Sequence, residues 1–521
     1  MLRLFLLILF GTKALAQTVL VAPYLQPGNG SGLDGTDVKV LSWVTDQKPA
    51  EFRVEYGAEG GVSRQSKPVQ VKLDFGLPKP KPASKPAATP VPANAVTPVA
   101  GAAALRDAPT DLDEVKKQAA KESAVAVSDK EQHYFTYSAK LEGLPFDSIV
   151  RYRVSMGMKV IREGSFRTRA SAGKPIHFVA VGDLANGKPE QNAIAWQIAQ
   201  KRPEFLVALG DLVYSQGRVG QYMHHFWPVY NDVLKSSSKT GAPLLGTIPI
   251  YPVIGNHDAD IAKLPDYPDA FGAYYFFHVP LNGPGAGGWN LPLGKEKEVA
   301  DRFLANVGDT YPSLNIYSWD YGPAHFVALD SNSYSKVDDP KFRAWLENDL
   351  RTTKQPWKFV CFHAPAFHTS REHYTEQKMR LLEPIFEQAG VDVVFAGHVH
   401  NYQRSKPLKF TPEGGRDKRG RVNGEFVLDE AYDGIKDTTP EGIIHVVSGG
   451  GGATLYKIDL VKTIEGLKKD HGVNYVPFTT KYVADTHSFS MIDVSLTTFE
   501  LRQIGISGEE LDHFVITKGA K

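Results

Sequence analysis

Short segments in which apolar and polar residues alternate fill the first third of the chain. Residues 38–44 (Val-Lys-Val-Leu-Ser-Trp-Val) are rich in β-branched and aromatic side chains, and residues 52–56 (Phe-Arg-Val-Glu-Tyr) alternate and end at Gly57. Further segments of this kind cover residues 133–141, 149–154 and 164–168. Short strands at regular spacing with turn residues between them are typical of a β-sandwich. We therefore predict a small β-sandwich over residues 17–172.

One segment, at about residues 76–128, interrupts this pattern. Proline, alanine and lysine dominate its first half, from Pro78 to Ala104. Such a tract buries too little apolar surface to order itself. It is either a tether, for example to a cell wall, or a tolerated surface insertion. The small entropic cost of lengthening a surface loop favours the insertion.

After Lys174 the pattern changes to uniformly apolar runs that alternate with helical stripes. The apolar runs cover residues 176–181, 205–209, 250–254, 326–329, 359–362, 391–395 and 443–447. Helical spacing of apolar residues occurs at 193–199, 340–350 and 379–389, whereas residues 271–304 have the glycine, proline and aromatic content of a long loop. Uniformly apolar strands belong to a sheet that is covered on both faces. We predict an α/β domain over residues 173–521.

The N-terminus indicates export. Residues 1–16 combine Arg3, a short apolar run and Ala14-Leu15-Ala16, which together predict a signal peptide that is cleaved after Ala16. Its apolar run is too short to span a bilayer, and no later segment is long and apolar enough. The predicted location is secreted or periplasmic. Cys361 is the single cysteine and lies in an apolar run, so we expect a buried thiol and no intramolecular disulfide.

Composition and charge narrow the function classes. The 521 residues carry a formal net charge of +1, and the pI is about 7.8. A chain without a strong basic excess is a poor binder of nucleic acid by bulk charge. We therefore expect neither a nucleic-acid partner nor a membrane partner.

Side chains that bind metals follow five of the predicted strands of the α/β region. In chain order they lie in Gly182-Asp183, Gly210-Asp211-Leu212-Val213-Tyr214, Gly255-Asn256-His257-Asp258, His363-Ala364-Pro365 and Gly397-His398-Val399-His400. Open α/β sheets place their sites at the carboxyl ends of their strands. A glycine before the ligand lets the backbone turn sharply. One such pair alone is usually an ordinary turn, but the whole set in one domain indicates a metal site.

The donor set is too large for one tetrahedral ion. It consists of Asp183, Asp211, Tyr214, Asn256, His363, His398 and His400. Such a set suits two ions that share a bridging carboxylate, as in two-metal hydrolases, and Asp211 is the natural bridge. A Tyr214 phenolate would be a hard anionic donor that favours Fe(III).

These blocks resemble the sequence blocks of the calcineurin-like metallophosphoesterases, and Tyr214 narrows the resemblance to the purple acid phosphatases. The resemblance implies a fibronectin type III-like β-sandwich followed by an α/β/β/α metallophosphoesterase sandwich. Residues 22–26 (Ala-Pro-Tyr-Leu-Gln) resemble the start of that first domain. The resemblance covers nearly all of the mature chain except the segment at about 76–128.

Carried over by position, the resemblance implies which residues hold each ion. Asp183, Tyr214 and His400 would hold one ion, and Asn256, His363 and His398 the other, with Asp211 bridging. The implied ions are Fe(III) and a divalent Fe, Zn or Mn. The chain departs from the family at Asp258, where glutamate is usual, and at residues 365–368 (Pro-Ala-Phe-His), where tyrosine-asparagine is frequent.

The expected reaction is hydrolysis of a small phosphate monoester. Two close cations bind the phosphate oxygens and lower the pKa of a bound water, and the resulting hydroxide attacks phosphorus in line. An imidazolium then protonates the departing alkoxide. The candidates for this general acid are His257 and His368, with His373 as a weaker third.

Two alternatives stay open at this stage. A phosphodiesterase or nucleotide hydrolase would use identical ligands and different loops. A binding or adhesion protein would use the sandwich and carry an inert phosphoesterase domain, but the complete ligand set argues against it.

Overall fold

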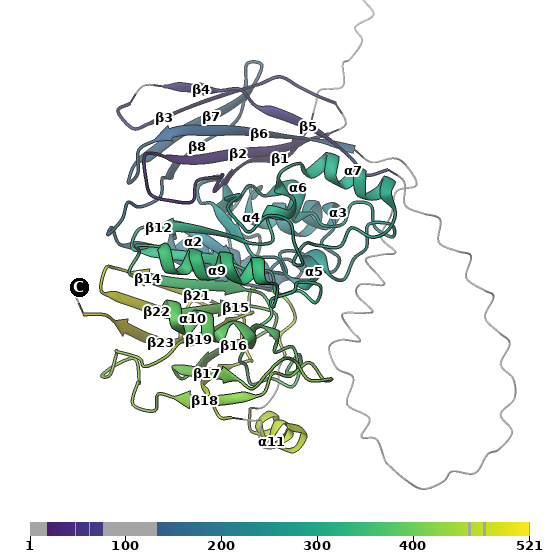
Figure 1. Ribbon diagram of the computed structural model, residues 1–521. Helices are drawn as coiled ribbons and strands as arrows, with labels where there is room; N and C mark the ends of the chain where they lie inside the picture. Colours follow the sequence, from purple (N-terminus) through teal and green to yellow (C-terminus); the bar gives the residue numbers. More distant parts are fainter. Residues whose placement is uncertain are drawn as a thin grey trace, which may run out of the picture.

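The computed structural model describes residues 18–46, 48–61, 63–76, 133–456, 460–471 and 476–519. The predicted signal peptide of residues 1–16 and nearly all of the predicted insertion lie outside this part of the chain. Figure 1 shows a strand-rich unit at one end, a larger mixed α/β unit below it, and the C-terminus beside the latter.

The N-terminal unit is a sandwich of two four-stranded antiparallel sheets, as predicted. One sheet has the order β1 (Val19–Gln26), β2 (Asp37–Thr45), β6 (His133–Leu144) and β5 (Val69–Asp74). The other has the order β4 (Arg64–Ser66), β3 (Phe52–Ala58), β7 (Ile149–Met156) and β8 (Lys159–Arg167). Alternation decides which side chains face inward: in β7, Val150, Tyr152 and Val154 are buried and the residues between them are exposed.

Two larger sheets form the second unit. The first has the order β11 (Ile250–Pro252), β10 (Phe205–Ala208), β9 (Ile176–Val181), β21 (Ser488–Val494), β22 (Thr498–Gly505) and β23 (Glu510–Thr517). The second has the order β12 (Tyr317–Tyr321), β13 (Ala324–Ala328), β14 (Trp357–Phe362), β15 (Val393–Ala396), β19 (Ile444–Ser448), β16 (Tyr402–Ser405) and β20 (Thr479–Val483). Strands β9 to β11 are mutually parallel, and so are β13, β14, β15 and β19.

The two sheets pack face to face. The ring of Phe178 in the first sheet lies 5.3 Å from that of Phe326 and 6.2 Å from that of Phe359 in the second. Helices α9 and α10 lie against the sheet that holds β14 and β15 (Figure 1), and α2 packs on β21 of the other. The α/β/β/α order of layers is therefore confirmed. Uniformly apolar strands result because each is covered on both faces.

Helices and short turns complete the domain. The helices are α2 (Pro189–Lys201), α3 (Val219–Gln221), α4 (Trp227–Tyr230), α5 (Asn256–Ala259), α6 (Ala273–Phe276), α7 (Lys297–Val307), α8 (Thr310–Ser313), α9 (Pro340–Thr352), α10 (Glu383–Ala389) and α11 (Leu460–His471). The remaining elements are the π-helix η1 (Tyr222–Phe226), the 3₁₀ turns η2 (Leu244–Gly246) and η3 (Lys378–Leu382), and the hairpin of β17 (Leu408–Pro412) and β18 (Gly424–Leu428).

Helix α9 follows its sequence signals. Asp339 caps its N-terminus by accepting hydrogen bonds from the amides of Lys341 and Phe342, and Pro340 occupies the first turn. Phe342, Leu346 and Leu350 recur on one face and are buried.

Two predictions of helix extent were wrong. The helix expected over residues 379–389 is a 3₁₀ turn followed by α10, because Pro384 has no amide hydrogen to continue an α-helix through that point. The long loop expected over residues 271–304 contains α6 and most of α7. Helix α7 has apolar residues at helical spacing, Val299, Phe303 and Val307, but the glycine and proline content of residues 281–294 favoured a loop over the whole segment.

The two units share one core and several polar contacts. Val21, Tyr24 and Val44 of the sandwich belong to the same buried cluster as the first large sheet. Tyr24 donates a hydrogen bond to the carbonyl of Phe276 (2.8 Å), and Tyr152 donates one to that of Gly246 (2.7 Å).

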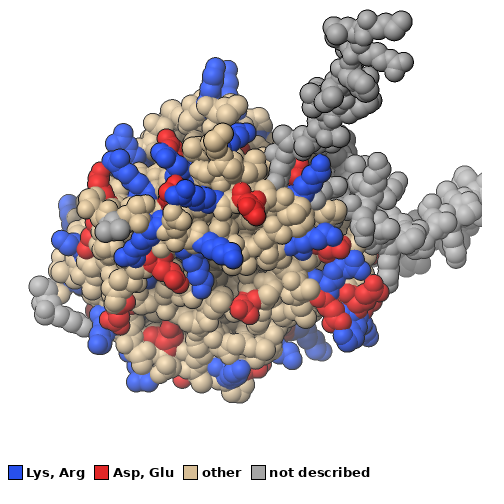
Figure 2. Space-filling view, turned by 90° about the horizontal axis from the view of Figure 1, so that it is seen from above, with Lys and Arg blue, Asp and Glu red and all other residues tan. Residues whose placement is uncertain are grey.

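The surface seen from above the view of Figure 1 carries interspersed positive and negative side chains (Figure 2), in keeping with the net charge of +1. Cys361 is buried, as expected, and burial raises the pKa of its thiol. Within the described ranges, no helix has the length and apolar content that a membrane span requires.

Candidate metal centre

The carboxyl ends of strands from both sheets meet at one place. Asp183 follows β9, Asp211 follows β10, and Asn256 follows β11, and these strands lie side by side in the first sheet. His363 follows β14, and His398 follows β15, in the second sheet. Because the sheets face each other, their strand ends bring these side chains together.

One group of donors gathers around Tyr214. Its hydroxyl donates to Asp183 Oδ1 (2.8 Å) and lies 3.1 Å from His400 Nε2. His400 Nε2 is in turn 3.3 Å from Asp183 Oδ1. All three side chains are buried. These are the residues that the resemblance assigned to one ion.

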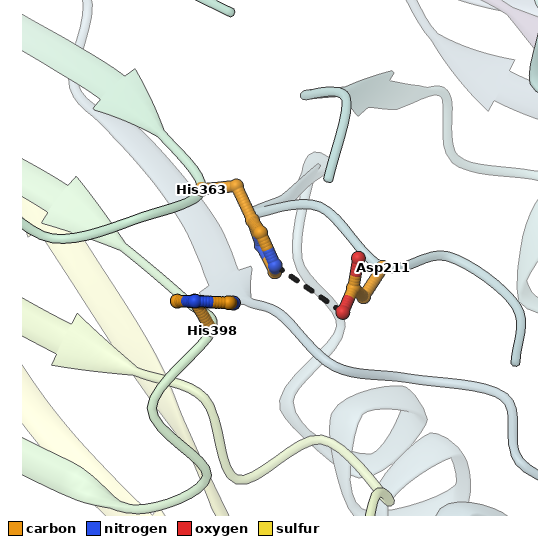
Figure 3. Close-up of side chains that lie close together, drawn as sticks. All are labelled: Asp211, His363 and His398. Atoms are coloured by element: carbon orange, nitrogen blue, oxygen red, sulfur yellow. Dashed lines mark ion pairs between the residues drawn. The ribbon is translucent and has the colours of Figure 1, made fainter. Parts of the chain in front are cut away.

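A second group gathers around His363. Its Nε2 lies 3.2 Å from Asp211 Oδ2 and 3.0 Å from Asn256 Oδ1. Figure 3 shows His363 and Asp211 pointing toward each other, with His398 beside them. Asp211, His363 and His398 each offer a ligand atom within 4.8 Å of the others. Asp211 therefore takes part in the second group.

Backbone carbonyls orient two of the imidazoles. His363 Nδ1 lies 2.7 Å from the carbonyl oxygen of Leu209, and His400 Nδ1 lies 2.7 Å from that of Thr454. A carbonyl only accepts, so each Nδ1 carries a hydrogen and each Nε2 faces the cluster. This is the arrangement that protein metal sites use to fix a histidine ligand.

Backbone amides orient the two carboxylates in a similar way. Asp183 Oδ2 accepts the amide hydrogen of His398 (2.8 Å), and Asp211 Oδ1 accepts that of His257 (2.8 Å). The other oxygen of each carboxylate faces the donors described above. Asp183, Asp211 and His398 also have left-handed backbone angles, with φ of 62°, 51° and 67°. Such strain is concentrated at functional positions.

Two glycines that precede predicted ligands lie so close to other ligand side chains that no Cβ would fit. A Cβ at Gly255 would lie 2.2 Å from Asp211 Oδ1, and one at Gly210 would lie 2.4 Å from His363 Nδ1. Any side chain at either position would displace the Asp211 carboxylate or the His363 ring. The repeated glycine-ligand pattern in the sequence thus has a steric cause.

Asp258, which departs from the family pattern, supports two of these turns. Its Oδ1 accepts the amide hydrogen of Leu212 (3.1 Å), and its Oδ2 accepts that of Gly255 (3.0 Å). Burial, together with the charge of Asp211, raises the pKa of the Asp258 carboxyl to about 8. An aspartate therefore reaches both backbone segments and holds the turns after β10 and β11 together.

The two predicted general acids lie in different surroundings. His257 Nδ1 donates to the carbonyl of Ser215 (2.7 Å), and its Nε2 lies 3.9 Å from Asp211 Oδ2. His368 is buried, and burial lowers its pKa to about 3, with His373 and His398 adding to the shift. Its Nδ1 has no hydrogen-bond partner in the part of the chain that the structure describes. His257 therefore faces the cluster, and the structure does not bring His368 into it.

Three further side chains complete the arrangement, two of which the sequence did not single out. His373 Nδ1 lies 2.7 Å from Glu376 Oε1, and Glu376 Oε2 lies 3.1 Å from His398 Nε2. The Tyr456 ring stacks on His400 at 4.4 Å, and its hydroxyl lies 3.3 Å from His373 Nε2. The spacing of His373 and Glu376 was a usable signal, whereas nothing around Tyr456 marked it.

A cavity of about 550 Å³ opens beside the cluster. The cavity is lined by predicted ligands, by His373 and Glu376, and by basic side chains. Its lining includes Asn256, His363, His398, His373, Glu376, Lys378, Arg416 and Arg419. A small phosphorylated molecule would fit this volume.

Comparison with known proteins gives one family. The sequence model described as calcineurin-like phosphoesterase matches residues 176–402. Purple acid phosphatase 21 of Arabidopsis thaliana is 29% identical over 251 residues, which cover 47% of this chain and 48% of that protein. Purple acid phosphatase 18 of the same plant is 26% identical over 284 residues, which cover 53% and 50%.

Other similarities bear on activity and fold. Probable inactive purple acid phosphatase 24 of Arabidopsis thaliana is 26% identical over 320 residues, 60% of this chain and 42% of that protein. The chain thus spans about half the length of the curated relatives it matches. The solved structure of a purple acid phosphatase from yellow lupin seeds covers 96% of this chain and 74% of its own, with a TM-score of 0.61 and 17% identity, which shows a shared fold.

Proposed function

Because this chain contains a calcineurin-like phosphoesterase domain and is a purple acid phosphatase-like member of that superfamily, we propose that it hydrolyses phosphate monoesters with two metal ions. One observation carries the proposal. Buried oxygen and nitrogen donors from the strand ends of both sheets converge, and backbone groups orient them toward one place.

The donor set fits a binuclear centre. Asp183, Tyr214 and His400 would hold one ion, and Asn256, His363 and His398 the other, with Asp211 between them. Buried carboxylates require a positive partner. Burial lowers the pKa of His363 and the Asp211 charge more than offsets this, so that the pKa rises to about 10. A bound cation would take the place of that proton. We propose Fe(III) beside Tyr214 and a divalent Fe, Zn or Mn at the other position.

The chain would contribute proton transfer and orientation. When bound, the two cations supply Lewis-acid contacts to the phosphate and a nucleophilic water near neutral pH. His373 lies at the cavity, its Nδ1 lies 2.7 Å from Glu376 Oε1, and its Nε2 lies beside the Tyr456 hydroxyl. We propose that His373 protonates the leaving oxygen, with His257 as the alternative donor. His368 is set aside because burial keeps it neutral.

The sequence supports a proposal for cellular location and partners. We propose cleavage after Ala16, export to the periplasm or the medium, and a small phosphorylated substrate rather than nucleic acid or a membrane. We also propose the division into a domain over residues 17–172 and a catalytic domain over residues 173–521. A secretion assay with residues 1–16 deleted tests export, and retention of the deleted protein in the cytoplasm is the expected result.

Two other activities remain as alternatives. A phosphodiesterase or nucleotide hydrolase would use the same donors. An inert protein would resemble the relative named as a probable inactive phosphatase. The purified protein, assayed with p-nitrophenyl phosphate and bis-p-nitrophenyl phosphate and analysed for metal content, separates these possibilities. We expect preference for the monoester and two metal ions per chain. Preference for the diester would support the first alternative, and two bound ions without hydrolysis of either compound would support the second.

The Tyr214→Phe variant tests the identity of the metals. A phenolate on Fe(III) absorbs visible light by charge transfer, so we expect a coloured protein that bleaches in this variant. A colourless wild-type protein that contains only zinc or manganese would refute the iron assignment.

A further inference from the structure

The cavity beside the candidate metal centre also contains two arginine side chains. Arg416 and Arg419 lie in the loop that joins β17 to β18, and both line the cavity together with His363 and His398. Both arginines are exposed. This loop is far in sequence from the predicted ligands, apart from His398 and His400.

Among the residues that the structure describes, neither guanidinium has a hydrogen-bond or ion-pair partner. Across the described ranges, no ion pair or side-chain hydrogen bond is recorded for Arg416 or Arg419. Their neighbour Arg421 differs, because it pairs with Asp417 at 2.7 Å. A planar guanidinium without a partner at the wall of a cavity is suited to bind phosphate through two parallel hydrogen bonds.

The loop that carries them is held in place. Asp417 Oδ1 accepts the amide hydrogens of Arg419 (2.8 Å) and Arg421 (2.9 Å). Gly420 packs so closely that a Cβ there would lie 2.6 Å from the carbonyl oxygen of Thr375. The amide of Val422 donates to Gln377 Oε1 (3.0 Å). These contacts fix the loop to the segment that carries Glu376, so the arginines keep their position relative to the centre.

A second cavity extends the basic surface. It has a volume of about 630 Å³ and shares Ser333, Lys378 and Arg416 with the first. Lys336 and Arg343 also line it. Lys378 Nζ donates to the carbonyls of Asn332 and Ser335, which anchors the wall between the two cavities.

Basic side chains outnumber acidic ones in the lining of the two cavities: Lys336, Arg343, Lys378, Arg416 and Arg419 against Asp260, Glu376 and Asp338. Asp260 accepts the amide hydrogen of Ser333 (3.1 Å), and Glu376 lies against His373 and His398. Asp338 is the acidic residue that lines the second cavity. The guanidinium groups therefore keep an excess of positive charge beside the position of the scissile phosphate.

We propose that Arg416 and Arg419 bind a second phosphate of the substrate, so that the substrate class is small organic molecules with two phosphate groups. This inference rests on the proposed phosphomonoesterase activity. One phosphate would lie at the metal centre while the other lies between the two guanidinium groups. The protein would prefer a doubly over a singly phosphorylated compound, because only the former has a second phosphate to pair and hydrogen-bond with the two arginines.

A matched pair of substrates tests the proposal. Propanediol bisphosphate and propyl phosphate differ only in the second phosphate, and phosphate release gives kcat/KM for each. Either of its two phosphate groups can react, so the bisphosphate has a statistical advantage of a factor of two. Beyond that factor, we expect kcat/KM of the wild-type protein to be about tenfold higher for the bisphosphate. The Arg416→Ala/Arg419→Ala double variant should lose this preference. The matched control is Lys418→Ala, which removes an exposed cation of the same loop that lines neither cavity.

The outcomes separate this inference from the proposed function. Equal preference in the wild-type protein and the double variant, or no preference in the wild-type protein, would overturn the inference while leaving the phosphatase activity intact. Loss of preference in Lys418→Ala would also overturn it, because unspecific charge would then explain the effect. If neither compound is hydrolysed, the proposed function fails. The inference is then decided by calorimetry: the ratio of the Kd values of the two compounds should fall in the double variant and not in Lys418→Ala.

Discussion

His368 and His373 lie close together in the chain but have different surroundings. His368 is buried without a carboxylate, and desolvation disfavours its charged form. His373 lies at the cavity and shares a short contact with Glu376. The two residues are five positions apart in the chain, yet only His373 lines the cavity.

A pair of alanine variants tests this difference. We expect His373→Ala to lower kcat for an alkyl phosphate by about a hundredfold, because an alkoxide must be protonated as it leaves. The effect on p-nitrophenyl phosphate should be much smaller, because nitrophenolate leaves without a proton. His368→Ala should reduce stability and leave the ratio of the two rates unchanged. Steady-state kinetics of folded protein give both ratios, and the opposite pattern would return the role to His368.

Among the secondary-structure elements, one histidine joins helix α9 to the hairpin of β12 and β13. His325 Nδ1 lies 2.6 Å from Asp320 Oδ1, and its Nε2 lies 2.9 Å from Asp349 Oδ2. Burial lowers the pKa of His325, but its bonds to the two carboxylates outweigh burial and raise the pKa to about 9. The protonated imidazole therefore stabilises the contact between helix and sheet.

This contact predicts a pH dependence of stability. The folded-state pKa lies above the ordinary value of 6.5. The contribution is thus complete below pH 6.5 and is lost as the pH rises through about 9. Its size is about 3 kcal/mol. Denaturant unfolding between these pH values should show a fall in stability that is absent in His325→Gln. If the free energy of unfolding changes with pH in the same way in both proteins, His325 is not the source of the pH dependence.

The β5–β6 hairpin bears on the predicted insertion. Asp74 pairs with His133 at the end of these antiparallel strands, so the chain leaves and re-enters the sheet at neighbouring positions. A short connection can join strands that end side by side. We expect replacement of residues 77–132 by a short glycine-serine turn to preserve the unfolding transition and the catalytic rate. Aggregation or loss of bound metal in the shortened protein would show that the segment contributes to the fold.

At the scale of the whole molecule, a buried charge cluster joins the sandwich to the catalytic unit. Arg169 Nε lies 2.8 Å from Asp37 Oδ1, and Lys39 Nζ lies 2.5 Å from Asp37 Oδ2, with all three side chains buried. Arg169 also donates to the carbonyl of Asp320 in the catalytic unit (3.1 Å). Burial raises the pKa of Asp37, and the two cations outweigh burial, so that its pKa stays below the usual range.

Removal of one cation should weaken both units together. We expect Arg169→Met to lower stability by about 3 kcal/mol, because Asp37 keeps only one of its two positive partners. The control is Arg53→Met, which breaks an exposed pair with Glu55 and should cost less than about 1 kcal/mol. Calorimetry should show a single transition at a lower Tm, since the units share a core. Two separate transitions in Arg169→Met, or equal effects of both variants, would contradict this.

The sequence by itself determined the sandwich, the layered α/β unit and the donor-bearing turns. Each depends on local order: alternation for half-buried strands, uniform apolar runs for covered strands, and a glycine followed by a donor at the strand end. Gly255 shows why this local signal is reliable, because no other residue fits against Asp211. The division into domains and the roles of individual donors stay predictions.

Only the tertiary structure decided which side chains surround the cavity. Glu376, Tyr456 and Arg416 come from loops without periodicity. Glu376 and Tyr456 contact histidines of the centre, and Arg416 lines the cavity beside it. The same holds for the choice between His368 and His373, which share one short segment and differ in burial. Local pattern specifies an element, but packing between elements decides which loop side chains are exposed to a cavity.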